Sequence, residues 1–196
     1  MIRIYTILTL SGYVGTLNIK SDFAKEIDSA FFKANGQFAK GTLYLSRLQK
    51  LYGNLAFYAL FSGQLASHNL DSAEKFFLGG PTGVRSYPQG EASGDEGCIL
   101  TGEFRYTLSG APGIKKIPGD LQFILFADAG YSRINDDAWN SLFSNASNLY
   151  GAGIGLNWTT RYFTLRTSYG LKIGSEQETS DAIRDGRFWL QLMGHF

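Results

Sequence analysis

Cysteine, net charge and long apolar runs are all scarce in this 196-residue sequence, and each absence narrows the class of protein. The one cysteine, Cys98, has no partner for an internal disulfide and no neighbouring set of metal ligands, so we interpret it as an apolar strand residue. A net charge of +1 indicates neither a nucleic-acid partner nor an anionic surface. No apolar run reaches the roughly 18 residues of a membrane-spanning helix.

Glycine (24 residues) and aromatic side chains (15%) are instead abundant, which is typical of a β protein with tight packing and aromatic belts. The length predicts one domain with a sizeable core. Alternation of residue type every two positions predicts strands, and a segment of about 10 residues can cross a bilayer as a tilted strand. The predicted strands are 3–13, 38–48, 55–66, 98–108, 121–131, 150–158, 163–172 and 187–196.

The connections and the polar faces of these strands distinguish a membrane barrel from a soluble one. Short connections on one side and long loops on the other are the pattern of outer-membrane barrels. The short ones are 50–54, 109–120 and 159–162, and the long ones are 15–37, 68–97, 135–148 and 174–186. Charges on the polar faces would be costly in a small filled core but tolerable in a wet lumen. We therefore predict an all-β fold, an antiparallel transmembrane β-barrel with Glu103, Arg105, Asp128, Arg166 and Lys172 facing its lumen.

The most unusual stretch is residues 76–97, FFLGGPTGVRSYPQGEASGDEG, which lies between two predicted strands. Its six glycines and two prolines let the backbone take positive φ and approach other backbone closely. Apolar anchors at both ends indicate an ordered, functional loop. Three acidic residues could suggest a calcium site, but their spacing fits no known calcium loop, so we favour a solvated, charged loop for Glu91, Asp95 and Glu96.

Two patterns that are familiar from soluble enzymes fail on their context. Gly151, Gly153 and Gly155 have GxGxG spacing, but no helix follows that could bind a phosphate group. His68 and His195 have no convincing nucleophile beside them, so a catalytic triad is unsupported. We predict no enzymatic activity, no metal site and no cofactor.

The loop closely resembles the sixth extracellular loop of two-partner secretion transporters of the haemolysin secretion/activation type. Arg85 falls on the arginine of that family's VRGY tetrad, and Ser86 stands where glycine is commonest. A second motif, FxDxG, matches residues 126–130, FADAG, and the chain ends in an aromatic residue, as in this family. The residues singled out in these motifs are Gly79, Gly80, Val84, Arg85, Ser86, Tyr87, Phe126, Asp128, Gly130 and the C-terminal Phe196.

This resemblance implies a bacterial outer-membrane translocator that secretes a haemolysin-like or adhesin-like partner protein through its pore. Residues 1–196 would form the C-terminal part of the barrel domain, the last eight strands of about sixteen, without POTRA domains or a signal peptide. The loop would fold back into the lumen, where Arg85 would pair with Asp128, and Ser86 should keep an ordinary φ because serine avoids positive φ.

The partners implied are the secreted polypeptide, outer-membrane lipids and, through the C-terminal strand, the barrel-assembly machinery, with no nucleic acid. Two alternatives stay open: a barrel-assembly or insertion relative from the same superfamily, and a small self-contained outer-membrane barrel. Aromatic residues at strand ends are expected at the membrane interfaces, namely Tyr131, Tyr150, Trp158, Tyr162 and Phe196.

Overall fold

The structure is a computed structural model that describes residues 4–108, 118–135 and 144–195, and its main element is one antiparallel sheet of eight strands. The strand order is β1-β2-β3-β6-β7-β8-β9-β10, so each strand pairs with the next main strand along the chain. The predicted antiparallel sheet is confirmed. The strands are β1 (Tyr5–Leu17), β2 (Gly36–Tyr52), β3 (Leu55–Ala66), β6 (Glu96–Leu108), β7 (Asp120–Arg133), β8 (Ala146–Thr159), β9 (Phe163–Lys172) and β10 (Gly186–Gly194).

Most strands are longer than the alternation of residue types indicated. β2 has 17 residues and β8 has 14. The added residues include polar pairs at the strand ends, such as Gln37 opposite Thr16 and Ser147 opposite Ser132. Backbone hydrogen bonds extend the ladder whether or not side chains alternate, so the apolar pattern marks only the middle of each strand.

The two faces of the sheet differ as predicted. A row of large apolar side chains crosses the outer face from β6 to β10, each directly opposite the next, and all of them are exposed. Glu103 and Asp128 lie on the inner face and are buried. An exposed apolar face of this extent is suited to lipid. The outer row consists of Phe104, Leu125, Ile154, Tyr169 and Phe188.

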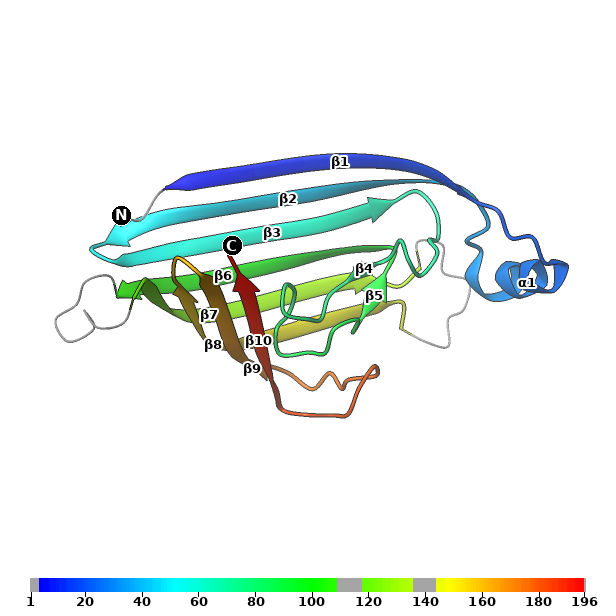
Figure 1. Ribbon diagram of the computed structural model, residues 1–196. Helices are drawn as coiled ribbons and strands as arrows, with labels where there is room; N and C mark the ends of the chain where they lie inside the picture. Colours follow the sequence, from blue (N-terminus) through cyan, green and yellow to red (C-terminus); the bar gives the residue numbers. More distant parts are fainter. Residues whose placement is uncertain (1–3, 109–117, 136–143, 196) are drawn as a thin grey trace.

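The sheet is curled, and the long connection between β3 and β6 lies within the curl (Figure 1). Among the described residues β1 pairs only with β2, and β10 pairs only with β9, so these eight strands do not close on themselves. Each edge strand therefore presents an unpaired row of backbone groups.

A helical segment in the connection between β1 and β2 was missed in the sequence, where residues 15–37 were interpreted only as a long loop. It consists of α1 (Asp22–Ile27) followed by a π-helical turn, Asp28–Phe32, and Ser21 caps its start by accepting from Ala24 N. Asp28 is buried and closes the segment by accepting from two backbone N–H groups that follow it. No helix in the described part of the chain is both long and apolar enough to cross a membrane.

The core of the molecule lies where the long loop packs on the inner face of the sheet. Two short strands, β4 (Phe76–Phe77) and β5 (Ser93–Gly94), pair at the base of the loop. The loop contributes three fully buried side chains to an apolar cluster, and β6 and β8 contribute one each. The cluster consists of Leu78, Val84, Tyr87, Ile99 and Leu149.

Trp158, near the end of β8, provides a test of where the membrane interface lies. Its indole Nε1 donates to Pro118 O at 2.9 Å, and its ring meets Phe163 edge-on. A tryptophan that keeps a polar partner at a strand end belongs at headgroup depth. In intact protein with Trp158 as the only tryptophan, we expect stronger quenching by lipids labelled near the headgroup than by lipids labelled at the acyl-chain end. Stronger quenching from the bilayer centre contradicts this placement.

Candidate functional site: the loop docked on the inner face

Glycines shape the loop by letting its backbone fold tightly on itself. Gly80 has φ +127°, which other residues rarely adopt. A Cβ atom on Gly79 would lie 2.2 Å from Pro88 O, and one on Gly83 would lie 2.0 Å from Leu78 O. Any side chain at these positions would therefore push the two arms of the loop apart.

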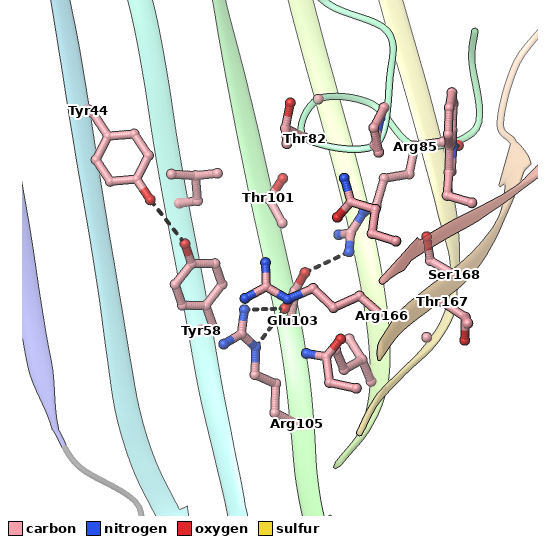
Figure 2. A pocket seen from close by; sticks show the side chains of 18 of the residues that line it. Tyr44, Tyr58, Thr82, Arg85, Thr101, Glu103, Arg105, Arg166, Thr167 and Ser168 are labelled. Carbon is pink, nitrogen blue, oxygen red and sulfur yellow. Dashed lines mark hydrogen bonds and ion pairs between the residues drawn. The ribbon is translucent and has the colours of Figure 1, made fainter. Parts of the chain in front are cut away.

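The tip of the loop, residues 84–87, carries Arg85 against two carboxylates of the sheet. Its backbone N and guanidinium Nε donate to Asp128 Oδ2 at 3.1 and 2.9 Å, and its Nη2 donates to Asp128 Oδ1 at 2.8 Å. Its Nη1 donates to Glu103 Oε1 at 2.7 Å (Figure 2). The structure thus brings Arg85 and Asp128 together, and it adds Glu103, which the motif comparison had not singled out.

Burial of Arg85 would by itself lower the pKa of the guanidinium, but hydrogen bonds and charge from Asp128 and Glu103 outweigh it and raise that pKa. The side chain of Arg85 is 11% exposed, and those of Asp128 and Glu103 are 0% and 6% exposed. One buried cation therefore faces two buried anions, and Arg105 supplies the balancing charge to Glu103 at 2.6 Å. Removal of any one of these four charged side chains would leave an uncompensated buried charge and destabilise the docked loop.

Each of the three fixed residues of the FxDxG motif on β7 makes a different contact with the loop. Phe126 places its ring beneath the Arg85 guanidinium, with 3.5 Å between the guanidinium carbon and the ring centroid. Asp128 accepts from Arg85 and also from Thr101 Oγ1 at 2.9 Å. Gly130 leaves room for the loop, because a Cβ there would lie 2.9 Å from Val84 Cγ2.

Ser86 and Tyr87 complete the tip and are both fully buried. Ser86 Oγ donates to Tyr150 O at 3.5 Å, and Tyr87 Oη donates to Glu176 O at 3.5 Å. Among the described residues only Lys33 and Ala92 are non-glycine residues with positive φ, so the prediction that Ser86 keeps an ordinary φ is confirmed. Burial raises the pKa of Tyr87, and the nearby carboxylates, first among them Glu176, add to this.

A second attachment, which no sequence pattern had indicated, joins the loop to the connection between β9 and β10. The carboxylate of Glu91 is buried and accepts five hydrogen bonds, all from the backbone N–H and hydroxyl groups of Thr179 and Ser180. The shortest two, from the hydroxyls, are 2.7 Å. Periodicity cannot link positions 88 residues apart, and none of these residues lies in a motif that the sequence comparison used.

The interpretation of the acidic residues of the loop as a solvated group was wrong. Asp95 is fully buried and accepts from Lys75 Nζ at 2.6 Å and from Leu70 N at 3.0 Å. Glu96 is half-buried and accepts from Arg133 Nε at 3.0 Å. These carboxylates face separate partners, and among the described residues no group of three or more potential metal ligands is found. Asp95 thus ties the loop to Leu70 and Lys75 of the preceding segment, and Glu96 pairs with Arg133 across the ladder between β6 and β7.

The attachment at Glu91 should be sensitive to acid. Burial acts to raise the pKa of Glu91, but hydrogen bonds from Ser180 and Thr179 outweigh it and lower that pKa. The attachment therefore contributes fully above the ordinary glutamate pKa of about 4.3 and is lost as the pH falls through the lower value of the docked state. Hydrogen exchange at the amides of Thr179 and Ser180, corrected for intrinsic rates, should be unchanged between about pH 6 and 8 and rise below about pH 4.

The control for that measurement is Glu91→Gln, which has no charge to lose. The acid step should disappear in this variant, and its exchange should be faster than wild type at neutral pH. An acid step of equal size in Glu91→Gln would assign the effect to another group.

A cavity of ≈ 420 Å³ lies on the inner face beside the loop tip. Figure 2 shows Arg105 and Arg166 extending into it below Arg85. Trp189 of β10 also lines it and donates from Nε1 to Arg85 O at 2.7 Å. Arginine side chains thus line this cavity, in contrast to the apolar outer face of the same strands.

The two histidines and the C-terminal residue considered in the sequence do not belong to the loop site. His195 contacts Thr164 Oγ1 at 3.0 Å and His68 contacts Ser67 Oγ at 3.1 Å, far from each other in the sheet. Phe196, the C-terminal aromatic residue, lies outside the described residues.

A sheet with an apolar outer face, a polar inner face and a loop fastened inside defines the chain as strands of a transmembrane β-barrel with an internal loop. The chain belongs to the haemolysin secretion/activation protein family ShlB/FhaC/HecB, whose family model matches residues 10–158.

Relatives and a solved structure agree with this assignment. The chain is 28% identical to the heme/hemopexin transporter protein HuxB of Haemophilus influenzae (strain 86-028NP), over 97% of this chain and 33% of HuxB. It is 24% identical to the outer membrane transporter CdiB of Dickeya dadantii (strain 3937), over 76% of this chain and 25% of CdiB. The structure of CdiB from Escherichia coli shares the fold, with a TM-score of 0.70 and 19% identity, over 97% of this chain and 34% of CdiB. The chain thus spans about one third of the length of HuxB.

Proposed function

We propose that this chain is the C-terminal part of the barrel of a bacterial outer-membrane transporter that secretes a partner polypeptide through its lumen. The family match supports transport, and the relatives HuxB and CdiB are named as transporters. The observation that carries the proposal is the loop tip held by Arg85 against Asp128 and Glu103 inside the curl of the sheet. A loop fastened there by polar contacts can set the bore of a conduit.

The unpaired edges of β1 and β10 support the expectation that further strands complete the barrel, up to about sixteen. The apolar outer face supports outer-membrane lipids as the surrounding medium, and β10 is the strand through which barrel-assembly machinery would engage the chain. The identity of the secreted partner would be set by parts of the transporter that lie beyond these strands.

Co-expression tests the function directly. The intact protein should release a co-expressed candidate exoprotein, encoded beside its gene, into the medium, and deletion of residues 84–87 should stop that release. After purification and reconstitution into planar bilayers, the intact protein should also conduct ions. The loop deletion should change the conductance or the lifetime of the open channel. Accumulation of other outer-membrane barrels in the periplasm on depletion, with exoprotein release unaffected, would instead assign it to barrel assembly.

A further inference from the structure

The glycines of β8 and β9 form a bare strip of backbone beneath the loop tip. Gly151 and Gly153 lie on the inner face of β8, and Gly170 of β9 lies directly opposite Gly153. A Cβ on Gly170 would lie 3.0 Å from Ser86 N and 3.1 Å from the carbonyl carbon of Arg85. The loop tip therefore rests on strand backbone at a distance that a side chain would prevent.

Gly151 is the point of closest approach. A Cβ there would lie 2.0 Å from Ser86 Oγ and 2.8 Å from Ser86 Cβ. Rotation of the serine hydroxyl cannot relieve this overlap, because Ser86 Cβ itself is too close. With the serine side chain removed, the nearest remaining contact would be Leu171 O at 3.2 Å, which a small shift accommodates.

Trp189 of β10, on the same inner face of the sheet, holds the same part of the loop. Its indole donates to the carbonyl oxygen of Arg85, the residue that precedes Ser86, at 2.7 Å. Ser86 is fully buried, with the indole contact on the residue before it and the bare backbone of β8 against its side chain. The loop tip has no room to move sideways if a methyl group is added at position 151.

We propose that Gly151 and Ser86 are a matched pair of positioning residues: the absent side chain on β8 provides the seat for the serine, and this fit sets where Arg85 docks. The proposal rests on the proposed transport function. It also explains physically how this chain accommodates a serine at a position where the resemblance implies glycine, since the volume added by Ser86 enters the space above Gly151.

Four variants of the intact protein test the pair: Gly151→Ala, Ser86→Gly, the double variant and Gly155→Ala. Gly155 is the matched control, because it lies on the same strand and the same face. A Cβ there would meet Thr167 O at 3.1 Å, much like the Leu171 O contact at position 151, and its three nearest atoms all belong to strands and not to the loop. Readouts are hydrogen exchange of the peptide containing residues 84–87, exoprotein release, and heat-modifiable migration as the measure of barrel assembly.

In Gly151→Ala, overpacking should raise exchange at residues 84–87 by about five- to a hundredfold and reduce release in parallel. Gly155→Ala should remain within about threefold of wild type. Ser86→Gly should raise exchange less than Gly151→Ala, because it empties the seat without creating an overlap, and the double variant should return to about the level of Ser86→Gly. Rescue of Gly151→Ala by Ser86→Gly is the decisive result, because general damage to β8 would not be repaired by a change in the loop.

The proposal is overturned if residues 84–87 exchange as fast in the double variant as in Gly151→Ala. It is also overturned if Gly155→Ala raises exchange and lowers release as much as Gly151→Ala does. If Gly151→Ala prevents barrel assembly, assembly itself becomes the readout. The double variant must then restore assembly, and failure to restore it overturns the proposal. Exchange that follows the prediction while release stays at the wild-type level overturns the positioning role in transport and leaves the seat itself established. Absence of release in the wild type, with conduction also absent, counts against the proposed function, whereas the exchange comparison still decides the pair.

Discussion

Replacement of Arg85 with alanine is expected to stop release of the partner protein while the barrel still assembles. The substitution removes three hydrogen bonds donated by the guanidinium and leaves Asp128 and Glu103 as buried carboxylates without that cation. Breaking a buried pair of this kind costs about 3–5 kcal/mol when burial is complete, and less when water enters. The cost falls on loop docking, since the strands keep their own hydrogen bonds. Release of the partner and heat-modifiable migration measure the two effects separately.

Three further variants define the contact between Arg85 and Asp128. Arg85→Lys keeps the charge but loses the planar fork that reaches two carboxylates, so it should remain defective. Asp128→Ala should impair release as well, and the double variant Arg85→Ala with Asp128→Ala should be little worse than Arg85→Ala alone. Arg166→Ala is the control, because Arg166 lines the same cavity and, in the described part of the chain, donates no hydrogen bond to the loop; exchange at residues 84–87 should be unchanged. Additive losses in the double variant would show that the two residues act separately.

The second large effect is expected on β10, where neighbouring residues face opposite environments. Leu190 is exposed on the outer face, in the middle of the strand, and Gln191 lines the inner cavity. Leu190→Arg should destabilise the intact barrel in lipid by about 2–4 kcal/mol if it lies near the midplane, whereas Gln191→Arg should cost little. Urea unfolding of the two variants in lipid vesicles measures the difference. Equal losses of stability would show that the outer face of β10 is not the lipid face.

Strands and faces could be predicted because a half-buried sheet repeats every two residues, and that repeat is visible over a few positions. The helical turn at residues 22–32 was missed because its apolar residues, Phe23, Ile27 and Phe31, are exposed and were embedded in a connection judged by length alone. The contact between Arg85 and Asp128 was predicted from two motifs rather than from any local pattern. The two motifs predict a contact between residues 43 positions apart, whereas periodicity describes only neighbouring positions within one strand.

The attachments that lacked a motif could not be predicted. Glu91 has the appearance of any acidic loop residue, and only the fold shows that it is buried against Thr179 and Ser180. A phosphate-binding interpretation of the glycines of β8 was set aside because no helix follows them, but their structural purpose depends on which segment lies above them. Sequence shows that a side chain is absent, whereas the structure shows what occupies the space.

The partners of the loop tip also determine when the tip can be in place during folding. Arg85 and Ser86 contact residues 18, 43, 64 and 104 positions further along the chain, on β6, β7, β8 and β10 in turn. Closing separations of this length is slow compared with forming hairpins between neighbouring strands. The full set of contacts exists only after Trp189 of β10 has joined the sheet, so a docked tip marks a sheet whose last strand is already in position.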